Sequence, residues 1–248
     1  MRTRTLTATM IVLMLSQGMF FACKRTEATR AQAAPEAHQQ AMVEKSFEES
    51  KKNIVARVNG EAMTMFTLLR EMNALASQYR NAGQQRTPEL DEKIRKQALD
   101  VVIFQELAVQ DAKKRGMTAT PEELDREIKK IKADAGSENA FREYLAANGL
   151  SEAEFRKVIE QDVLFEMIAA QEIDAGITVT DAALRERYNK EKTGLKDSAH
   201  RKMTFEDSKG LIEQKIRAEA GAKKMREWET RLKKNARIEI VEQKQKQG

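Results

Sequence analysis

The sequence predicts a mostly α-helical protein in which short segments near the two ends of the chain pair as antiparallel strands. Charged residues make up 33% of the 248 residues and aromatic residues only 5%, a composition typical of helices with large solvated faces. Only three prolines and 11 glycines interrupt the chain. Apolar residues recur at helical spacing over most of its length, whereas residues 54–58 and 237–241 alternate apolar and polar positions.

The first folded segment is expected to be a hairpin followed by a helix. The alternating residues 54–58 lead into Asn59-Gly60, a pair typical of tight hairpin turns. Residues 61–63 would form the short return strand. Thr64 can then cap a helix that runs to about Asn81.

The next helix should follow Pro88 and end near Arg115, where Gly116 supplies a stop. Its centre, residues 101–104, is apolar on all sides, so we expect this helix to run through the core. Thr120-Pro121-Glu122-Glu123 has the features of a capping box with proline at the first helical position, and it should start another helix.

Four further helix starts share a serine or threonine that can cap the first turn. They are Ser137, Ser151, Thr180 and Thr204. Gly149 and Gly176 supply stops for the first two helices. The chain then closes with the alternating residues 237–241. Because unpaired backbone groups are costly, we expect this segment to pair with residues 54–58.

Residues 1–23 have the layout of a secretory signal, because Arg2 and Arg4 precede an apolar run. The run is too short and too interrupted for a membrane-spanning helix. At its end, Ala22-Cys23 resembles a bacterial lipoprotein lipobox, although Phe20 stands where that family usually has leucine. The alternative is an ordinary cleaved signal with an incidental cysteine.

On the lipoprotein interpretation, Cys23 becomes an acylated N-terminus that anchors the protein in a membrane, since several acyl chains anchor stably where one does not. Lys24 is not the aspartate associated with inner-membrane retention in some bacteria, so an outer-membrane address is expected in preference to an inner-membrane one. Because Cys23 is the only cysteine, no intramolecular disulfide can form.

Composition divides the chain into four expected parts. Residues 1–23 are the lipoprotein signal peptide. Residues 24–52 have few large apolar residues and read as a tether, helical toward its end. Residues 53–242 form the folded domain, and residues 243–248 are a tail.

Several segments together resemble the N-terminal chaperone module of SurA-type periplasmic proteins, which PrsA-type and PpiD-type foldases share. They are VARVNGEAMTMFTLLREM, VQDAKKRGMTATPEELDREI, LAANGLSEAEFRKVIEQDV and ITVTDAALRERYNK. The resemblance covers roughly residues 54–192, together with the C-terminal helix and strand that complete the module. It implies an ATP-independent chaperone, or holdase, for unfolded envelope or outer-membrane proteins.

Members of this family usually carry a parvulin prolyl isomerase domain after the segment that matches residues 188–192. Here only about a dozen residues, GLKDSAHRKMTF, separate that segment from the last helix. They are too few for a β-sheet with a substrate pocket. We therefore interpret His200 in this stretch as a loop residue and expect no enzymatic activity.

Other chemistry finds little support in the sequence. His38 lies in the tether, His200 in the connection and Cys23 at the leader, so no Cys/His metal cluster and no catalytic residues are expected. The sequence contains no phosphate-binding loop, so no cofactor is expected. Acidic and basic residues alternate without a basic stripe, so nucleic acid is not an expected partner. Asp162 and Glu166 are interpreted as a solvated or ion-paired helix face.

Methionine and aromatic side chains suit a surface that must accept many sequences, because methionine repacks and rings stack without demanding one partner. The expected peptide-binding residues are Met65, Met72, Tyr79, Phe141, Tyr144, Tyr188 and Met225. The alternative for each is an ordinary core position. For the whole protein, the alternatives to a chaperone are an adaptor for one envelope assembly and a prolyl isomerase with a degenerate site.

Overall fold

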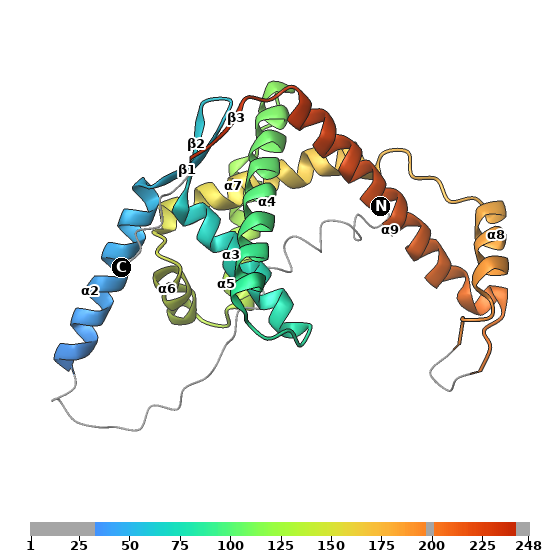
Figure 1. Cartoon of the computed structure of the whole chain (residues 1–248), viewed down its shortest axis with the longest axis horizontal. Coiled ribbons are helices and arrows are strands. Elements are labelled where there is room, and N and C mark those ends of the chain that lie inside the picture. Colours follow the sequence, from blue (N-terminus) through green and yellow to red (C-terminus); the bar gives the residue numbers. More distant parts are fainter. Residues whose placement is uncertain (1–32, 197–200, 242–248) are drawn as a thin grey trace. The chain divides into compact units, whose positions relative to one another are not determined.

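The computed structural model describes residues 33–196 and 201–241 (Figure 1). This part of the chain is helical apart from one small sheet, which confirms the predicted fold class. It divides into two compact units. Unit 1 contains the described residues up to Ile168 and from Leu232 onward, and unit 2 contains Ala169–Arg231.

The sheet of unit 1 has three antiparallel strands in the order β2-β1-β3. β1 (Ile54–Val58) and β2 (Glu61–Thr64) form the expected hairpin. Asn59 and Gly60 at its turn have φ values of 53° and 94°, the left-handed conformation that this turn type requires. β3 (Ile238–Ile240) pairs with β1 on the other side, so the two ends of the folded part meet as predicted.

The helices of unit 1 are α2 (Ala33–Lys52), α3 (Met65–Asn81), α4 (Pro88–Lys114), α5 (Pro121–Asp134), α6 (Glu138–Ala147) and α7 (Glu152–Ala169). All of these except α2 begin where the sequence signals placed them. Thr64, Thr120 and Ser137 accept hydrogen bonds from the first turns of α3, α5 and α6. Ser151 and Glu154 form the capping box of α7. Thr87 caps α4 as well, a cap that was not predicted from the sequence.

Besides a small cluster of Val58, Ile103 and Leu107, two apolar clusters hold the helices and the sheet of unit 1 together. In the first, Phe66 of α3 packs with buried residues of α5, α6 and α7, including Phe141 and Phe155. In the second, Val55 of β1 packs with Leu68 of α3 and with buried residues of α4. Burial in the middle of α4 confirms that this helix runs through the core.

α2 covers most of the segment, residues 24–52, that was expected to be a tether with helix only toward its end. From residue 44 onward its side chains are exposed except at Phe47, Ser50 and Lys51. Phe47 packs against the first apolar cluster. The ordered structure of unit 1 therefore includes contacts from residues that precede the hairpin.

Unit 2 consists of a short π-helix, η1 (Ala170–Asp174), then α8 (Asp181–Glu191) and most of α9 (Phe205–Lys234). The helix expected to run to Gly176 ends at Ala169 and continues as the wider π-helical turn. Leu184, Leu195 and Ile212 form the buried core of this unit.

The connection between α8 and α9 spans residues 192–204. Lys196 and Lys202 form an isolated antiparallel bridge across it. His200 lies outside the described residues, as does Cys23.

Candidate functional site

The predicted peptide-binding residues fall into both units of the structure. Met65, Met72 and Tyr79 lie on α3, and Phe141 and Tyr144 lie on α6. Tyr188 and Met225 lie on α8 and α9 of unit 2. Within unit 1, the structure brings Met65 and Met72 together in one cluster and Phe141 and Tyr144 in another.

The two methionines belong to a partly exposed apolar area that we call the methionine surface, formed by Met63, Met65, Leu69, Met72 and Leu75. Met63, Met65, Met72 and Leu75 are partly buried against the second apolar cluster. Met65, Leu69 and Met72 follow one another at helical spacings of four and three residues, so they share a face of α3. Leu69 is 39% exposed.

The underlying residues make this surface firm. Leu68 and Ala98 beneath it are 1% and 0% exposed, respectively, and both belong to the cluster that joins α3 to α4. Unbranched methionine side chains can change rotamer on such a support at little cost, and their sulfur atoms are polarisable. The surface can therefore adapt to apolar groups of different shapes.

Tyr79 extends the seam between α3 and α4 beyond the methionines. Its hydroxyl donates a hydrogen bond to Gln97 Oε1 at 2.8 Å. The Lys93 ammonium lies 5.2 Å from the centre of its ring, close enough for a cation–π interaction. These contacts fix the orientation of the partly exposed ring.

Phe141 has a different environment, because it is only 1% exposed. Its ring makes an edge-on contact with Phe155, with centroids 5.4 Å apart. Tyr144 is partly buried against the same Phe155 ring at 6.2 Å. Phe141 is thus a core residue in this structure, which is the alternative that the sequence left open.

A polar group of residues from α3, α6 and α7 adjoins the first apolar cluster. Asp162 of α7 is partly buried, and the loss of hydration raises its pKa to about 7. Arg70 opposes this rise, whereas Glu166 and Glu71 add to it. Burial also raises the pKa of Glu71 and that of Tyr144.

The expectation of a solvated or ion-paired face at Asp162 and Glu166 is therefore wrong. Both side chains are partly buried, and among the described residues neither has an ion pair within 4.0 Å. Burial raises the pKa of Glu166, with Glu127 of α5 adding to the rise and Lys130 opposing it. The spacing of four residues placed the two carboxylates on one face of α7 but could not tell which way that face points.

Unit 2 carries its own aromatic group where α8 meets α9. The Tyr188 and Phe205 rings are in edge-on contact at 5.6 Å. The Tyr188 hydroxyl donates to the carbonyl oxygen of Met203 at 3.1 Å, and the Arg185 guanidinium lies 4.5 Å from the Phe205 ring centre. Leu211 is 42% exposed on α9, and Met225 is partly exposed further along that helix.

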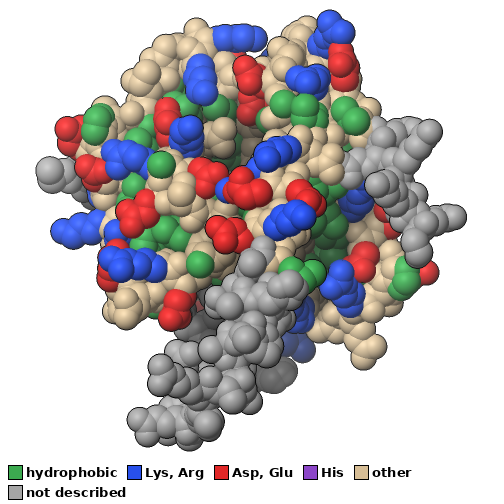
Figure 2. Space-filling view, turned by 90° about the vertical axis from the view of Figure 1, so that its left-hand side faces the viewer, with side chains coloured by type: hydrophobic (Ala, Val, Ile, Leu, Met, Phe, Trp, Pro, Cys, Tyr) green, Lys and Arg blue, Asp and Glu red, His purple; other side chains and the backbone are tan. Residues whose placement is uncertain are grey.

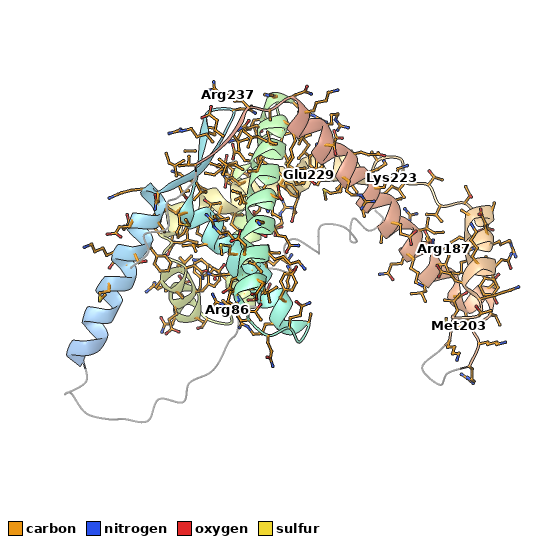
Figure 3. The ribbon with its side chains drawn as sticks, in the orientation of Figure 1. Arg86, Arg187, Met203, Lys223, Glu229 and Arg237 are labelled. Atoms are coloured by element: carbon orange, nitrogen blue, oxygen red, sulfur yellow. The ribbon has the colours of Figure 1, made fainter. Side chains whose placement is uncertain are left out.

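Ion pairs hold α8 to α9 beside this aromatic group. Arg187, labelled with Met203 in Figure 3, pairs with Glu191 of its own helix and with Glu219 of α9. Lys215 of α9 reaches Glu191 at 3.0 Å. These pairs raise the pKa of Arg187 and lower that of Glu191. The arrangement is structural, since each charge already has a partner.

The charged surface offers no concentration of one sign on the face shown in Figure 2, where basic and acidic side chains are interspersed with smaller apolar areas. Within residues 33–196 and 201–241, histidine, cysteine and carboxylate side chains form no group that could hold a metal ion. Over the same residues, every helix falls short of the length and apolarity needed to cross a membrane.

Comparisons with known proteins place more than half of the chain in one family. Residues 40–169 match the family model of the SurA-like N-terminal domain. The chain is 28% identical over 130 residues to the chaperone SurA of Nitrosospira multiformis, covering 52% of this chain and 29% of that protein. It is 25% identical over 180 residues to the chaperone SurA of Bordetella pertussis, covering 72% of this chain and 34% of that protein. The chain thus spans about a third of the length of these relatives.

A solved structure shares the fold. A chain from the SurA-like chaperones of Campylobacter jejuni, the virulence factor PEB4 and the periplasmic protein Cj1289, superposes with a TM-score of 0.51 at 15% identity. The match covers 77% of this chain and all of that one.

Four apolar side chains of the candidate surfaces were not predicted as peptide-binding residues. Met63, Leu69 and Leu75 belong to the methionine surface, and the helical spacing of Leu69 from Met65 could have identified it. Phe47 lies in a segment that is otherwise polar, and its local sequence gave no signal for the contact that it makes.

Proposed function

Because the chain belongs to the SurA-like N-terminal domain family, we propose that it is an ATP-independent chaperone of the bacterial cell envelope that holds unfolded proteins, including outer-membrane proteins. The observation that carries this proposal is the methionine surface. It presents adaptable apolar side chains on a firm support, which suits many different sequences better than a shaped pocket would.

The energetics favour transient capture. Burying about 500 Å² of apolar surface contributes roughly 12 kcal/mol before other terms. Association and the ordering of a flexible client remove on the order of 5–8 kcal/mol. The remainder corresponds to dissociation constants between millimolar and micromolar, so a client can be held and released without an energy source.

We further propose that residues 1–23 direct the chain out of the cytoplasm and that Cys23 carries acyl chains. Residues between Cys23 and α2 would then link the folded part to the membrane, with an outer-membrane address preferred. Anchoring would keep the chaperone close to a membrane into which its clients insert. The combination of a leader, a lone cysteine and a chaperone module supports this proposal.

An adaptor for one dedicated partner is the second candidate. The mixed charge of the face shown in Figure 2 disfavours it, because a dedicated interface would be expected to gather complementary charge or apolar area in one place. A prolyl isomerase is a weaker candidate, because residues 192–204 between α8 and α9 are too few for a parvulin domain.

The proposal can be tested by the suppression of aggregation. The full chain should keep several unrelated unfolded proteins in solution, among them an unfolded outer-membrane protein. A double variant, Met65→Ser with Met72→Ser, should lose most of this activity. Met42→Ser is the matched control, because Met42 is 62% exposed on α2 and lies outside the methionine surface.

Specificity separates the candidates. Activity toward several unrelated clients would support a chaperone, and capture of a single partner with no effect on other proteins would contradict it. A proline-isomerisation assay on a model peptide addresses the remaining alternative. Acceleration that disappears in His200→Ala would show an enzyme instead.

A further inference from the structure

Phe47 of α2 occupies an unusual place in unit 1. Its ring lies so close to Gly149 that a Cβ atom on residue 149 would be 2.4 Å from the ring carbon Cγ. On another side, the ring makes an edge-on contact with Phe66, with centroids 6.1 Å apart. We call the surface formed by Gly149 and Phe66 against this ring the Phe47 seat.

The seat exists because Gly149 lacks a side chain. Its φ of 61° places it in the left-handed region, where other residues are strained. Any side chain at this position would fill the space that the ring takes. The sequence around α6 thus leaves room for one flat aromatic group beside the first apolar cluster.

Over residues 44–52, few contacts hold α2 on the seat. Between residue 44 and the end of the helix, the only side chains that are buried or partly buried are those of Phe47, Ser50 and Lys51. The Lys51 ammonium pairs with Glu154 of α7 at 2.8 Å and lies 5.4 Å from the Phe66 ring centre. Both charged side chains keep part of their exposure, and such pairs are weak. One aromatic ring, the buried Ser50 and one partly exposed ion pair are the contacts of this segment, and another chain can displace them.

We propose that the Phe47 seat is a binding site for an aromatic side chain of an unfolded polypeptide, and that Phe47 occupies it in the free protein as an internal competitor. The inference rests on the proposed chaperone function and goes beyond it, because Phe47 and Phe66 belong to the first apolar cluster, whereas the methionines of the methionine surface pack against the second. A client with an aromatic residue takes the place of Phe47 and lifts α2. A client without one meets only the methionine surface.

The acidic neighbour adds to the preference of the site. Glu154 pairs with Lys51 and also accepts hydrogen bonds from the backbone N–H and the hydroxyl of Ser151. These contacts, that of Lys51 most of all, lower its pKa to about 2. When α2 leaves, this carboxylate remains ionised and loses its cation. A lysine or arginine near the aromatic residue of the client can then replace Lys51.

Competition within one chain predicts a measurable change in affinity. A cover that occupies a site for most of the time reduces the apparent affinity of any competitor by the fraction of time that the site is open. Phe47→Ala in the full chain should therefore bind a fluorescent 12-residue peptide of Gly, Ser and Lys with one central Phe about tenfold more tightly than the unchanged protein. The same peptide with Ala in place of Phe should show no gain.

Two further variants show whether a change in affinity for the peptide comes from release of α2 or from a loss of folding. Lys51→Ala keeps the ring but weakens the hold of α2, so it should bind the Phe peptide about twofold more tightly. Met42→Ala alters an exposed residue of the same helix and should bind it with unchanged affinity.

A direct reading of displacement completes the test. With 4-fluorophenylalanine at position 47, the fluorine resonance of the otherwise unchanged chain should move to that of an exposed ring when the Phe peptide is added, and stay in place with the Ala peptide. A resonance unmoved by saturating Phe peptide, or a Phe47→Ala chain that binds the peptide no more tightly, would overturn the inference. Preserved suppression of aggregation in that case leaves the chaperone proposal standing. If the full chain suppresses no aggregation, both the chaperone proposal and the inference about the Phe47 seat are wrong.

Discussion

Asn59 and Arg237 exchange two hydrogen bonds across 178 positions of the sequence. The backbone N–H of Asn59 donates to the carbonyl oxygen of Arg237 at 2.8 Å, and the backbone N–H of Arg237 donates to Asn59 Oδ1 at 2.9 Å. The amide group of Asn59 also donates to Gln110 Oε1 of α4 at 2.8 Å. One turn residue therefore joins the hairpin, the last strand and the central helix of unit 1.

Asn59→Ala should destabilise the protein by about 2 kcal/mol, because alanine is strained at positive φ and cannot replace the side-chain hydrogen bonds. Asn59→Gly relieves the strain and loses only the side-chain bonds, so its cost should be about 1 kcal/mol. Urea unfolding of both variants measures the difference. Equal stability of the two variants would show that the backbone conformation contributes nothing.

This junction was predictable in part from the sequence. Asn59-Gly60 predicts a hairpin through its own preference for positive φ. The pairing of β1 with β3 was predicted because the backbone N–H and C=O groups of two isolated strands need hydrogen-bond partners. The third partner, Gln110, was not predictable. It lies near the C-terminal end of α4, and nothing in its local sequence shows which residues will approach it in the fold.

The exposure of single side chains in the candidate surfaces was likewise not predictable from the sequence. Met65 and Phe141 both met the sequence criterion for a peptide-binding side chain, yet one is partly exposed and the other is buried. Helical periodicity identifies an apolar face, but whether another element covers that face depends on tertiary packing. Phe47 is the opposite case, because a single aromatic residue in a polar helix gives no periodic pattern at all.

Asp162 should make stability depend on pH. Its pKa in the folded protein is about 7, against an ordinary value of 3.8. Between about pH 4 and pH 7 the folded state thus binds more protons at this site than the unfolded state, so the contribution of Asp162 to stability falls as pH rises. Below that range Asp162 is protonated in both states. Above it Asp162 is ionised in both states, and the full cost of burying the charged carboxylate lowers the stability of the folded protein.

Asp162→Asn removes the ionisation and should stabilise the protein at pH 8 but change little at pH 4. A gain of about 1 kcal/mol would raise the Tm by about 2–4 °C in a protein of this size. Thermal unfolding at both pH values measures it. Glu160→Gln removes an exposed carboxylate from the same helix and serves as the control. A gain for Asp162→Asn that is equal at pH 4 and pH 8 would contradict the explanation.

The proposed lipid anchor predicts a change in location. Cys23→Ser removes the sulfur atom that would carry the acyl chain, so the protein should move from the membrane fraction of bacterial cells to the soluble fraction. Stable anchoring of this kind needs more than one chain, so the change should be nearly complete. Cell fractionation followed by immunoblotting measures it. Unchanged membrane association would point to a retained leader instead.

Gly149 and Gly83 form a matched pair for measuring the contact with Phe47. Both have positive φ, 61° and 76° respectively, but a Cβ atom at Gly83 would meet nothing within 4 Å. Gly83→Ala should therefore cost only the backbone strain, about 1 kcal/mol. Gly149→Ala carries the same strain and also pushes the Phe47 ring from its seat, so it should cost about 1–2 kcal/mol more through the lost aromatic contact.

The combination with Phe47→Ala separates these two costs. Once the ring is absent, alanine at position 149 meets no obstacle from α2, so Gly149→Ala should then cost no more than Gly83→Ala. Urea unfolding of the single and double variants gives the coupling between positions 47 and 149. A coupling of zero would mean that the ring moves aside without loss, because α2 would then contribute no stability through this contact.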